Sequence, residues 1–152
     1  MSAQASFDPS SPRPIDQRLA HYAQSHRHPI NERIHLVCVP LIVFSLLGML
    51  HSLHPFAAYA FVGASLVYYI RLSIPFLAAM SLMSAAMLAL LTALGDYALS
   101  VSIVVFVLAW IGQFIGHALE GKRPSFFEDV RYLWIGPLFC LSFLFRRLGI
   151  AW

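Results

Sequence analysis

Long apolar runs separated by short polar breaks dominate the chain from residue 34 onward. A helix needs about 20 predominantly apolar residues to cross the hydrocarbon core of a bilayer. Proline, glycine and charged residues stand between the runs, where they favour turns and end helices. We therefore expect four membrane-spanning helices, at about Ile34–Leu53, Phe56–Ile70, Phe76–Leu94 and Leu99–Leu119.

Two shorter segments carry weaker patterns. Asp16–Arg27 places Leu19 and Tyr22 on one side of a short amphipathic helix, and we expect this helix to lie at the membrane surface. Tyr132–Leu144 is apolar, but it is short and is interrupted by a Gly-Pro pair. We interpret it as a re-entrant or interfacial helix, while its spacing also allows a short fifth span.

Composition agrees with an all-α, multi-pass transmembrane bundle. The 152 residues are 59% hydrophobic and 11% charged, whereas soluble domains carry about 25% charged residues. The net charge of +3 is small and the basic residues are scattered, so we expect no nucleic-acid partner. Residues 1–15 are rich in Ser and Pro and predict a disordered tail, which leaves residues 16–152 as a single membrane domain.

The distribution of Lys and Arg predicts the orientation of the chain. With four spans, one side of the membrane receives every Lys and Arg between residues 13 and 131, while the connections at 53–55 and 94–100 contain none. Short cytoplasmic loops carry the excess of positive charge, so we expect a cytoplasmic N-terminus. No retention signal is recognisable and the tail is short, which favours a bacterial inner membrane over the endoplasmic reticulum.

Histidines gather at the expected cytoplasmic end of the bundle. Pro29 suits the first position of a helix, where its missing N–H costs nothing. Asn31 and His35 are four residues apart and therefore share one face of that helix. His26 precedes the helix closely enough to fold over its N-terminal end, and His28 stands directly before Pro29.

A polar stripe closes the fourth apolar run. Gln113, His117 and Glu120 share one face of an otherwise apolar helix, with Gly112 and Gly116 beside it to allow close approach of a neighbour. Polar residues within spans are costly and usually functional, and His with carboxylate ligands suits Fe, Mn or Zn. Taken singly, each histidine could equally be an interfacial residue that meets lipid headgroups. Their placement at one end of the bundle predicts that they converge on a metal.

Two motifs in these segments resemble those of the Mpo-like family of small multi-pass membrane proteins. The first runs from Tyr22 to His35, contains the pattern H-x-x-P-x-N-x-x-x-H, and continues to Pro40. The second covers Gln113–Glu120. The similarity extends over about residues 16–145.

The resemblance implies an enzyme of fatty acid α-oxidation. It would be an Fe(II)-dependent dioxygenase that uses O₂ to shorten a 2-hydroxy fatty acid by one carbon, with the polar head of its substrate at the cytoplasmic surface of the bilayer. The implied catalytic residues and iron ligands are His26, His35 and His117, with Glu120 as a further ligand. The implied supporting groups around the metal are Asn31, Gln113 and His28.

Two other functions fit the same residues. One is a metal- or haem-binding integral membrane protein without oxygenase activity. Histidine pairs deep within two spans would favour haem, whereas these histidines lie at the ends of the spans. The other is a structural membrane protein whose histidines only meet lipid headgroups. The oligomeric state stays open.

Overall fold

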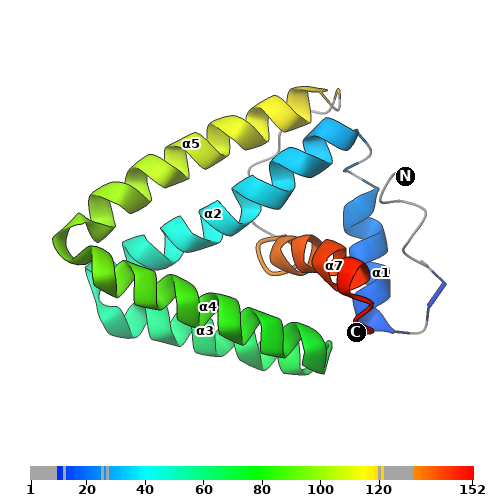
Figure 1. Cartoon of the computed structure of the whole chain (residues 1–152), viewed down its shortest axis with the longest axis horizontal. Helices are drawn as coiled ribbons and strands as arrows, with labels where there is room; N and C mark the ends of the chain where they lie inside the picture. The colour runs from blue at the N-terminus through cyan, green and yellow to red at the C-terminus, as the bar shows by residue number, and fades with distance from the viewer. Residues whose placement is uncertain (1–9, 12, 25, 27, 120, 122–131) are drawn as a thin grey trace. The chain divides into compact units, whose positions relative to one another are not determined.

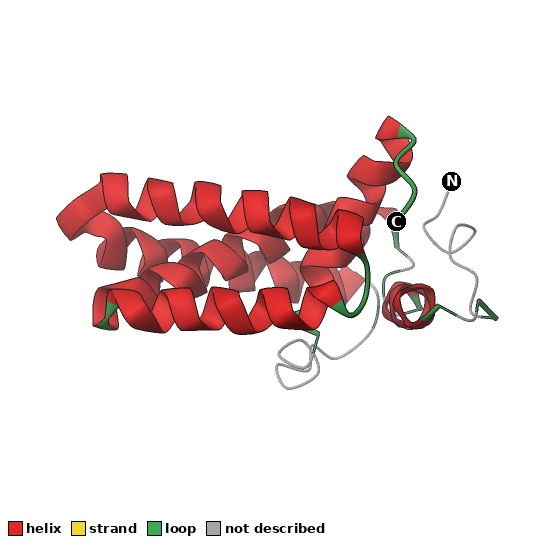
Figure 2. Cartoon of the chain, turned by 90° about the horizontal axis from the view of Figure 1, so that it is seen from below, coloured by secondary structure: helices red, strands yellow, loops and turns green. Residues whose placement is uncertain are grey.

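The structure is a computed structural model that describes residues 10–11, 13–24, 26, 28–119, 121 and 132–152. Every regular element in this part of the chain is helical, as Figure 2 shows, so the expected all-α class is confirmed there. The elements in chain order (Figure 1) are α1 (Pro14–Ala23), α2 (Pro29–Leu53), α3 (Pro55–Ile70), α4 (Ile74–Leu94), the 3₁₀ turn η2 (Gly95–Tyr97), α5 (Ala98–Leu119) and α7 (Gly136–Leu148).

Proline stands at the beginning of most of these helices. A proline in the first turn suits a helix because its fixed φ is already helical and because the N–H that it lacks would have no partner inside the helix. The helices that start in this way are α1 at Pro14, α2 at Pro29, α3 at Pro55, α4 with Pro75 and α7 with Pro137.

The helices belong to two compact units. One unit comprises residues 1–39 and 111–151, and the other comprises residues 40–110 together with Trp152. Helices α2 and α5 therefore contribute to both units, while α1 and α7 belong to the first and α3 and α4 to the second.

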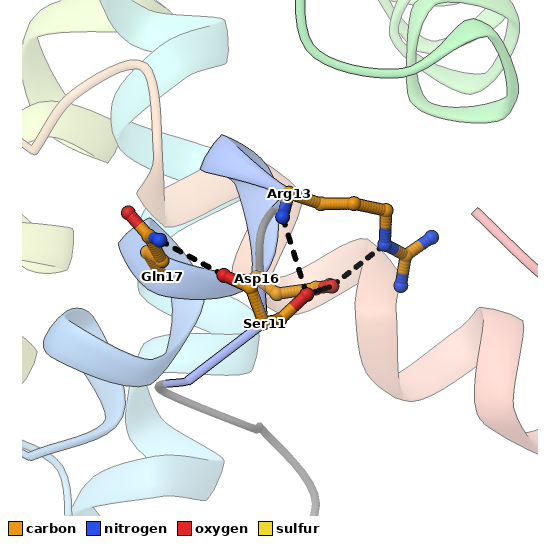
Figure 3. A network of polar contacts seen from close by, with 4 residues as sticks. All are labelled: Ser11, Arg13, Asp16 and Gln17. Atoms are coloured by element: carbon orange, nitrogen blue, oxygen red, sulfur yellow. Dashed lines mark hydrogen bonds and ion pairs between the residues drawn. The ribbon is translucent and has the colours of Figure 1, made fainter.

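A polar network around Asp16 holds the start of α1 (Figure 3). Asp16 Oδ2 accepts hydrogen bonds from Ser11 Oγ and Arg13 Nε, each at 2.7 Å, and Gln17 Nε2 donates to Ser11 O at 2.8 Å. A carboxylate in the first turn also complements the positive end of the helix dipole. The helix begins at Pro14, slightly before the expected Asp16. Of the tail expected over residues 1–15, residues 1–9 and 12 lie outside the described part of the chain.

The apolar side of α1 is buried within the first unit. Leu19 and Tyr22, which the sequence places on that side, are 0% and 5% exposed. Helix α7 lies across α1 and contacts it (Figure 1). It contributes the fully buried Leu138 and Phe139, and the Phe139 ring lies 4.9 Å from that of Tyr22. The amphipathic pattern was therefore predicted correctly, and its apolar face is covered by protein.

Small residues bring the helices of the second unit close together. A Cβ atom added to Gly48 of α2 would overlap Ser102 Oγ of α5 and lie 2.8 Å from Leu91 Cδ2 of α4. Small side chains at helix interfaces allow backbones to approach closely, which is common where lipid supplies no hydrophobic drive between helices. Helices α3 and α4 lie side by side in this unit (Figure 1).

Within the described residues, two continuous helical stretches are long and apolar enough to cross a membrane. They are Pro29–Leu53, of 25 residues, and Ile74–Leu119, of 46 residues. The second contains both α4 and α5, and Gly95, with a φ of 52°, ends α4 between them. Helix α3 is apolar but shorter, at 16 residues. By length and composition, these helices could cross a membrane, but they do not establish the four expected spans.

Candidate metal centre

Three buried histidines converge within the first unit. His26 lies between α1 and α2, His35 in α2, and His117 in α5. One ring nitrogen of each lies within 4.8 Å of the others, and the three side chains are 2%, 1% and 6% exposed. The ring centroids are 4.1 Å apart for His26 and His35, and 5.1 Å apart for His35 and His117.

Backbone carbonyls orient two of these rings. His26 Nδ1 lies 2.8 Å from Tyr22 O, and His35 Nδ1 lies 3.0 Å from Asn31 O. A carbonyl oxygen only accepts hydrogen bonds, so Nδ1 carries the hydrogen in both rings. In a neutral imidazole the other nitrogen, Nε2, then keeps its lone pair. This is the arrangement of a metal-binding histidine, whose second nitrogen donates to a carbonyl or carboxylate.

Close packing of α5 against α2 brings His117 to this place. A Cβ added to Gly116 would overlap Asn31 Oδ1, and one added to Gly112 would lie 2.7 Å from Cys38 Sγ. Neither position can therefore hold a larger side chain without displacement. The close approach that the two glycines predicted from the sequence is confirmed, and it follows the small-xxx-small pattern of membrane helices.

Aromatic rings cover His26 on the side of α1 and α7. The Tyr22 ring stacks on the His26 ring, with centroids 4.3 Å apart and planes tilted by 15°. Phe139 of α7 lies 4.9 Å from Tyr22 and 5.9 Å from His26, centroid to centroid. Neither ring has a site role that was predicted from the sequence. Tyr22 lies four residues before His26, and this spacing could have predicted a contact between the two rings. No pattern in the sequence near His26 could have predicted the contact with Phe139.

A hydrogen bond ties α7 to the backbone at His35. Cys140 Sγ donates to His35 O at 3.6 Å. Burial raises the pKa of the Cys140 thiol to about 12, so this thiol stays protonated and acts as a hydrogen-bond donor near the site. Among the described residues, the clustered groups that could hold a metal are the three histidines, and Cys140 is not one of them.

The remaining residues expected at the site lie in different surroundings. Asn31 and Gln113 are 0% and 3% exposed, and Gln113 Oε1 has no hydrogen-bond partner in the described part of the protein. His28 is half-buried, and its Nδ1 accepts a hydrogen bond from Ile30 N at 3.3 Å at the start of α2. It is not one of the three clustered histidines. Glu120 lies outside the described residues.

The three imidazoles fit a divalent metal ion. Nitrogen atoms no more than 4.8 Å apart lie at most about 2.8 Å from a common centre, and metal–imidazole bonds are about 2.1 Å long. An inward movement of at most about 0.7 Å gives a bonded geometry. Imidazole suits Fe, Zn and Cu, and three such ligands leave coordination positions open for other molecules.

Comparison with known proteins identifies a family that this chain matches and a protein to which it is similar. Residues 13–148 match the model of the family described as 2-hydroxy-palmitic acid dioxygenase Mpo1-like. The chain is 30% identical over 140 residues to the Saccharomyces cerevisiae protein named 2-hydroxy-palmitic acid dioxygenase MPO1. That alignment covers 87% of this chain and 80% of the yeast protein. No solved structure matches the chain.

Proposed function

The chain belongs to the 2-hydroxy-palmitic acid dioxygenase Mpo1-like family, and on this premise we propose that it is an Fe(II)-dependent dioxygenase of 2-hydroxy fatty acids. Membership in this family makes the chain an oxidoreductase. The observation that carries the metal part of the proposal is the convergence of His26, His35 and His117, each buried, within 4.8 Å of one another.

In the proposed reaction the bond between C1 and C2 of the 2-hydroxy acid breaks. The acid and O₂ give a fatty acid shortened by one carbon, together with CO₂ and water. The atoms balance, and all the electrons that O₂ accepts come from C1 and C2 of the substrate. The reaction therefore needs no separate organic cofactor or reductant.

The residues of the site have distinct proposed roles. His26, His35 and His117 hold the metal, and Glu120 is a further proposed ligand. Iron(II), when bound there, supplies open coordination positions for the substrate and for O₂. The carbonyl of Tyr22 keeps the His26 ring in the tautomer that can bind metal.

The surroundings of the site also matter for the reaction. The Tyr22 and Phe139 rings exclude water from one side of His26. Asn31 and Gln113 are polar groups buried close to the ligands along α2 and α5, and Asn31 supports His35 through its backbone carbonyl. His28 has a lesser proposed role, because its Nδ1 accepts a hydrogen bond from the backbone N–H of Ile30 at the start of α2.

We also propose four membrane spans, α2 to α5, with a cytoplasmic N-terminus. The stretch Ile74–Leu119 is about 70 Å long as helix, more than twice the thickness of about 30 Å of a hydrocarbon core, and Gly95 divides it. Large apolar side chains on α5, such as Val104 and Leu108, are 56% and 62% exposed, which supports contact with lipid. A bacterial inner membrane is part of this proposal on sequence grounds alone.

The enzyme proposal is tested by product analysis. Detergent-purified protein, reconstituted anaerobically with Fe(II), is given 2-hydroxy-palmitic acid and O₂, and pentadecanoic acid is measured by mass spectrometry alongside O₂ uptake. We expect both signals in the wild type and in His51→Ala, a control outside the cluster. We expect neither in His35→Ala or His117→Ala.

Two outcomes would contradict the proposal in different ways. Bound metal with no product and no O₂ uptake would favour a metal- or haem-binding membrane protein without oxygenase activity. A protein that binds no metal after reconstitution would leave a structural role, with histidines that only meet lipid headgroups.

A further inference from the structure

Gln113 is a buried polar side chain with an unused hydrogen-bond acceptor. The residue is 3% exposed, and its Oε1 atom has no hydrogen-bond partner in the described part of the protein. Buried polar side-chain atoms are nearly always hydrogen-bonded, and each exception calls for an explanation such as a bound molecule. An amide oxygen is only an acceptor, so the missing partner has to be a donor.

Gln113 lies on the face of α5 that also carries His117, because it lies one helical turn before His117 and residues four apart in a helix lie on the same face. His117 is in the cluster with His26 and His35. Gly112, the neighbour of Gln113, approaches Cys38 of α2, so this part of α5 is packed against the helix that carries His35.

Orienting the clustered rings of His26 and His35 does not require Gln113. The Nδ1 atoms of both rings already lie at hydrogen-bonding distance from backbone carbonyls, those of Tyr22 and Asn31. A donor from the substrate is the better match for Gln113. A 2-hydroxy fatty acid differs from the plain fatty acid by one group next to the carboxylate, and that group is an O–H donor.

We propose that Gln113 Oε1 accepts a hydrogen bond from the 2-hydroxyl of the substrate and thereby selects 2-hydroxy acids over unsubstituted fatty acids. This inference rests on the proposed function and assigns a substrate-recognition role within the same site. A site that presents a buried acceptor to a hydroxyl discriminates strongly against an analogue without it, because the analogue leaves the acceptor unpaired. Carboxylate and alkyl chain, which both acids share, contribute nothing to this preference.

The test measures binding without turnover. Iron-loaded protein is titrated under anaerobic conditions with 2-hydroxy-palmitic acid and with palmitic acid, and the ratio of the two Kd values is the readout. We expect the wild type to prefer the hydroxy acid by tenfold or more. In Gln113→Met, which has a similar length but no acceptor oxygen, we expect that preference to fall at least tenfold, which corresponds to about 1.4 kcal/mol.

Two further variants make the result specific. Gln24→Met makes the same exchange at an exposed position and should keep the wild-type preference. Gln113→Glu retains an acceptor oxygen. Any repulsion between its carboxylate and that of the ligand acts on both acids equally, so it cancels in the ratio and the preference should remain. If Gln113→Met does not fold, 2-fluoropalmitic acid serves with the wild type, because fluorine replaces the hydroxyl without a hydrogen to donate. It should bind at least tenfold more weakly than the hydroxy acid.

The outcomes separate this inference from the proposed function. A wild type that binds neither acid would contradict the proposed function itself. A wild type that prefers the hydroxy acid, with the same preference in folded, iron-loaded Gln113→Met, would overturn only the role of Gln113. Equal affinity of the wild type for the hydroxy and fluoro acids would also overturn it.

Discussion

The contact between Gly112 and Cys38 gives a quantitative prediction for the packing of α5 against α2. A Cβ on Gly112 would lie 2.7 Å from Cys38 Sγ, whereas ordinary contacts begin at 3.4 Å, so about 0.7 Å has to be relieved in Gly112→Ala. Overpacking of this kind costs about 1–3 kcal/mol. The exchange also gains about 1 kcal/mol of helix propensity. We therefore expect Gly112→Ala to lower the free energy of unfolding by about 0–2 kcal/mol relative to the wild type.

Gly63→Ala is the matched control because nothing lies within 4 Å of a Cβ at that position in α3. It should gain about 1 kcal/mol from helix propensity alone. The free energies of unfolding of the two variants should therefore differ by about 1–3 kcal/mol. For a chain of this size, each kcal/mol shifts the Tm by about 2–4 °C.

A double-mutant cycle isolates the contact. In the Cys38→Ala background the sulfur is gone, so Gly112→Ala should become as favourable as Gly63→Ala. The coupling between the two positions should then be about 1–3 kcal/mol, the range found for residues in contact. The assay is thermal unfolding of detergent-purified protein at fixed detergent and iron concentrations. Equal effects of Gly112→Ala and Gly63→Ala, or a coupling near zero, would refute this packing.

Further predictions concern the ring on His26, the second unit and the metal. Tyr22→Leu should weaken iron binding about tenfold, because the ring stacked on His26 at 4.3 Å is lost, whereas Tyr22→Phe should bind nearly as the wild type does in an iron titration. Gly48→Val should lower the Tm through overlap with Ser102 yet keep the iron content per folded chain, and loss of iron in folded protein would contradict this. A chelator should lower the Tm of the iron-loaded wild type, since a ligand at 100 times its Kd stabilises by about 2.7 kcal/mol. No shift on chelation would show that the metal does not stabilise the fold.

Local patterns in the sequence were enough to predict the helices. The apolar runs, together with prolines ahead of α2, α3 and α4 and the Gly-Asp pair ahead of α5, marked these helices to within a few residues, because such signals act within one or two turns. Helix α2 begins at Pro29, the residue suited to its first position. The short apolar segment near the C-terminus is the helix α7, at Gly136–Leu148. Its interpretation as a re-entrant or interfacial helix stays a prediction.

The site could be predicted from the sequence only in part. Helical spacing placed Asn31 with His35, and the order of the runs placed His117 at the same end, so the structure brings together the three histidines that the sequence singled out. The ring of Phe139 next to His26 could not be foreseen, because it comes from a helix more than a hundred residues away in the chain. His28 was also expected near the metal; its ring nitrogen accepts a hydrogen bond from the backbone at the start of α2, and its role at the site stays a prediction.

If His26, His35 and His117 together hold one metal ion, each of them is needed for iron binding, and metal analysis of matched variants measures this. Wild type, His26→Ala, His35→Ala, His117→Ala and the control His51→Ala would be reconstituted anaerobically with Fe(II), freed of excess iron by gel filtration, and analysed for iron per folded chain. We expect iron near one per chain in the wild type and in His51→Ala, and a large loss of iron in each of the other three variants. Retention of wild-type iron content by any of those three variants, as folded protein, would contradict the assignment of that histidine as a ligand.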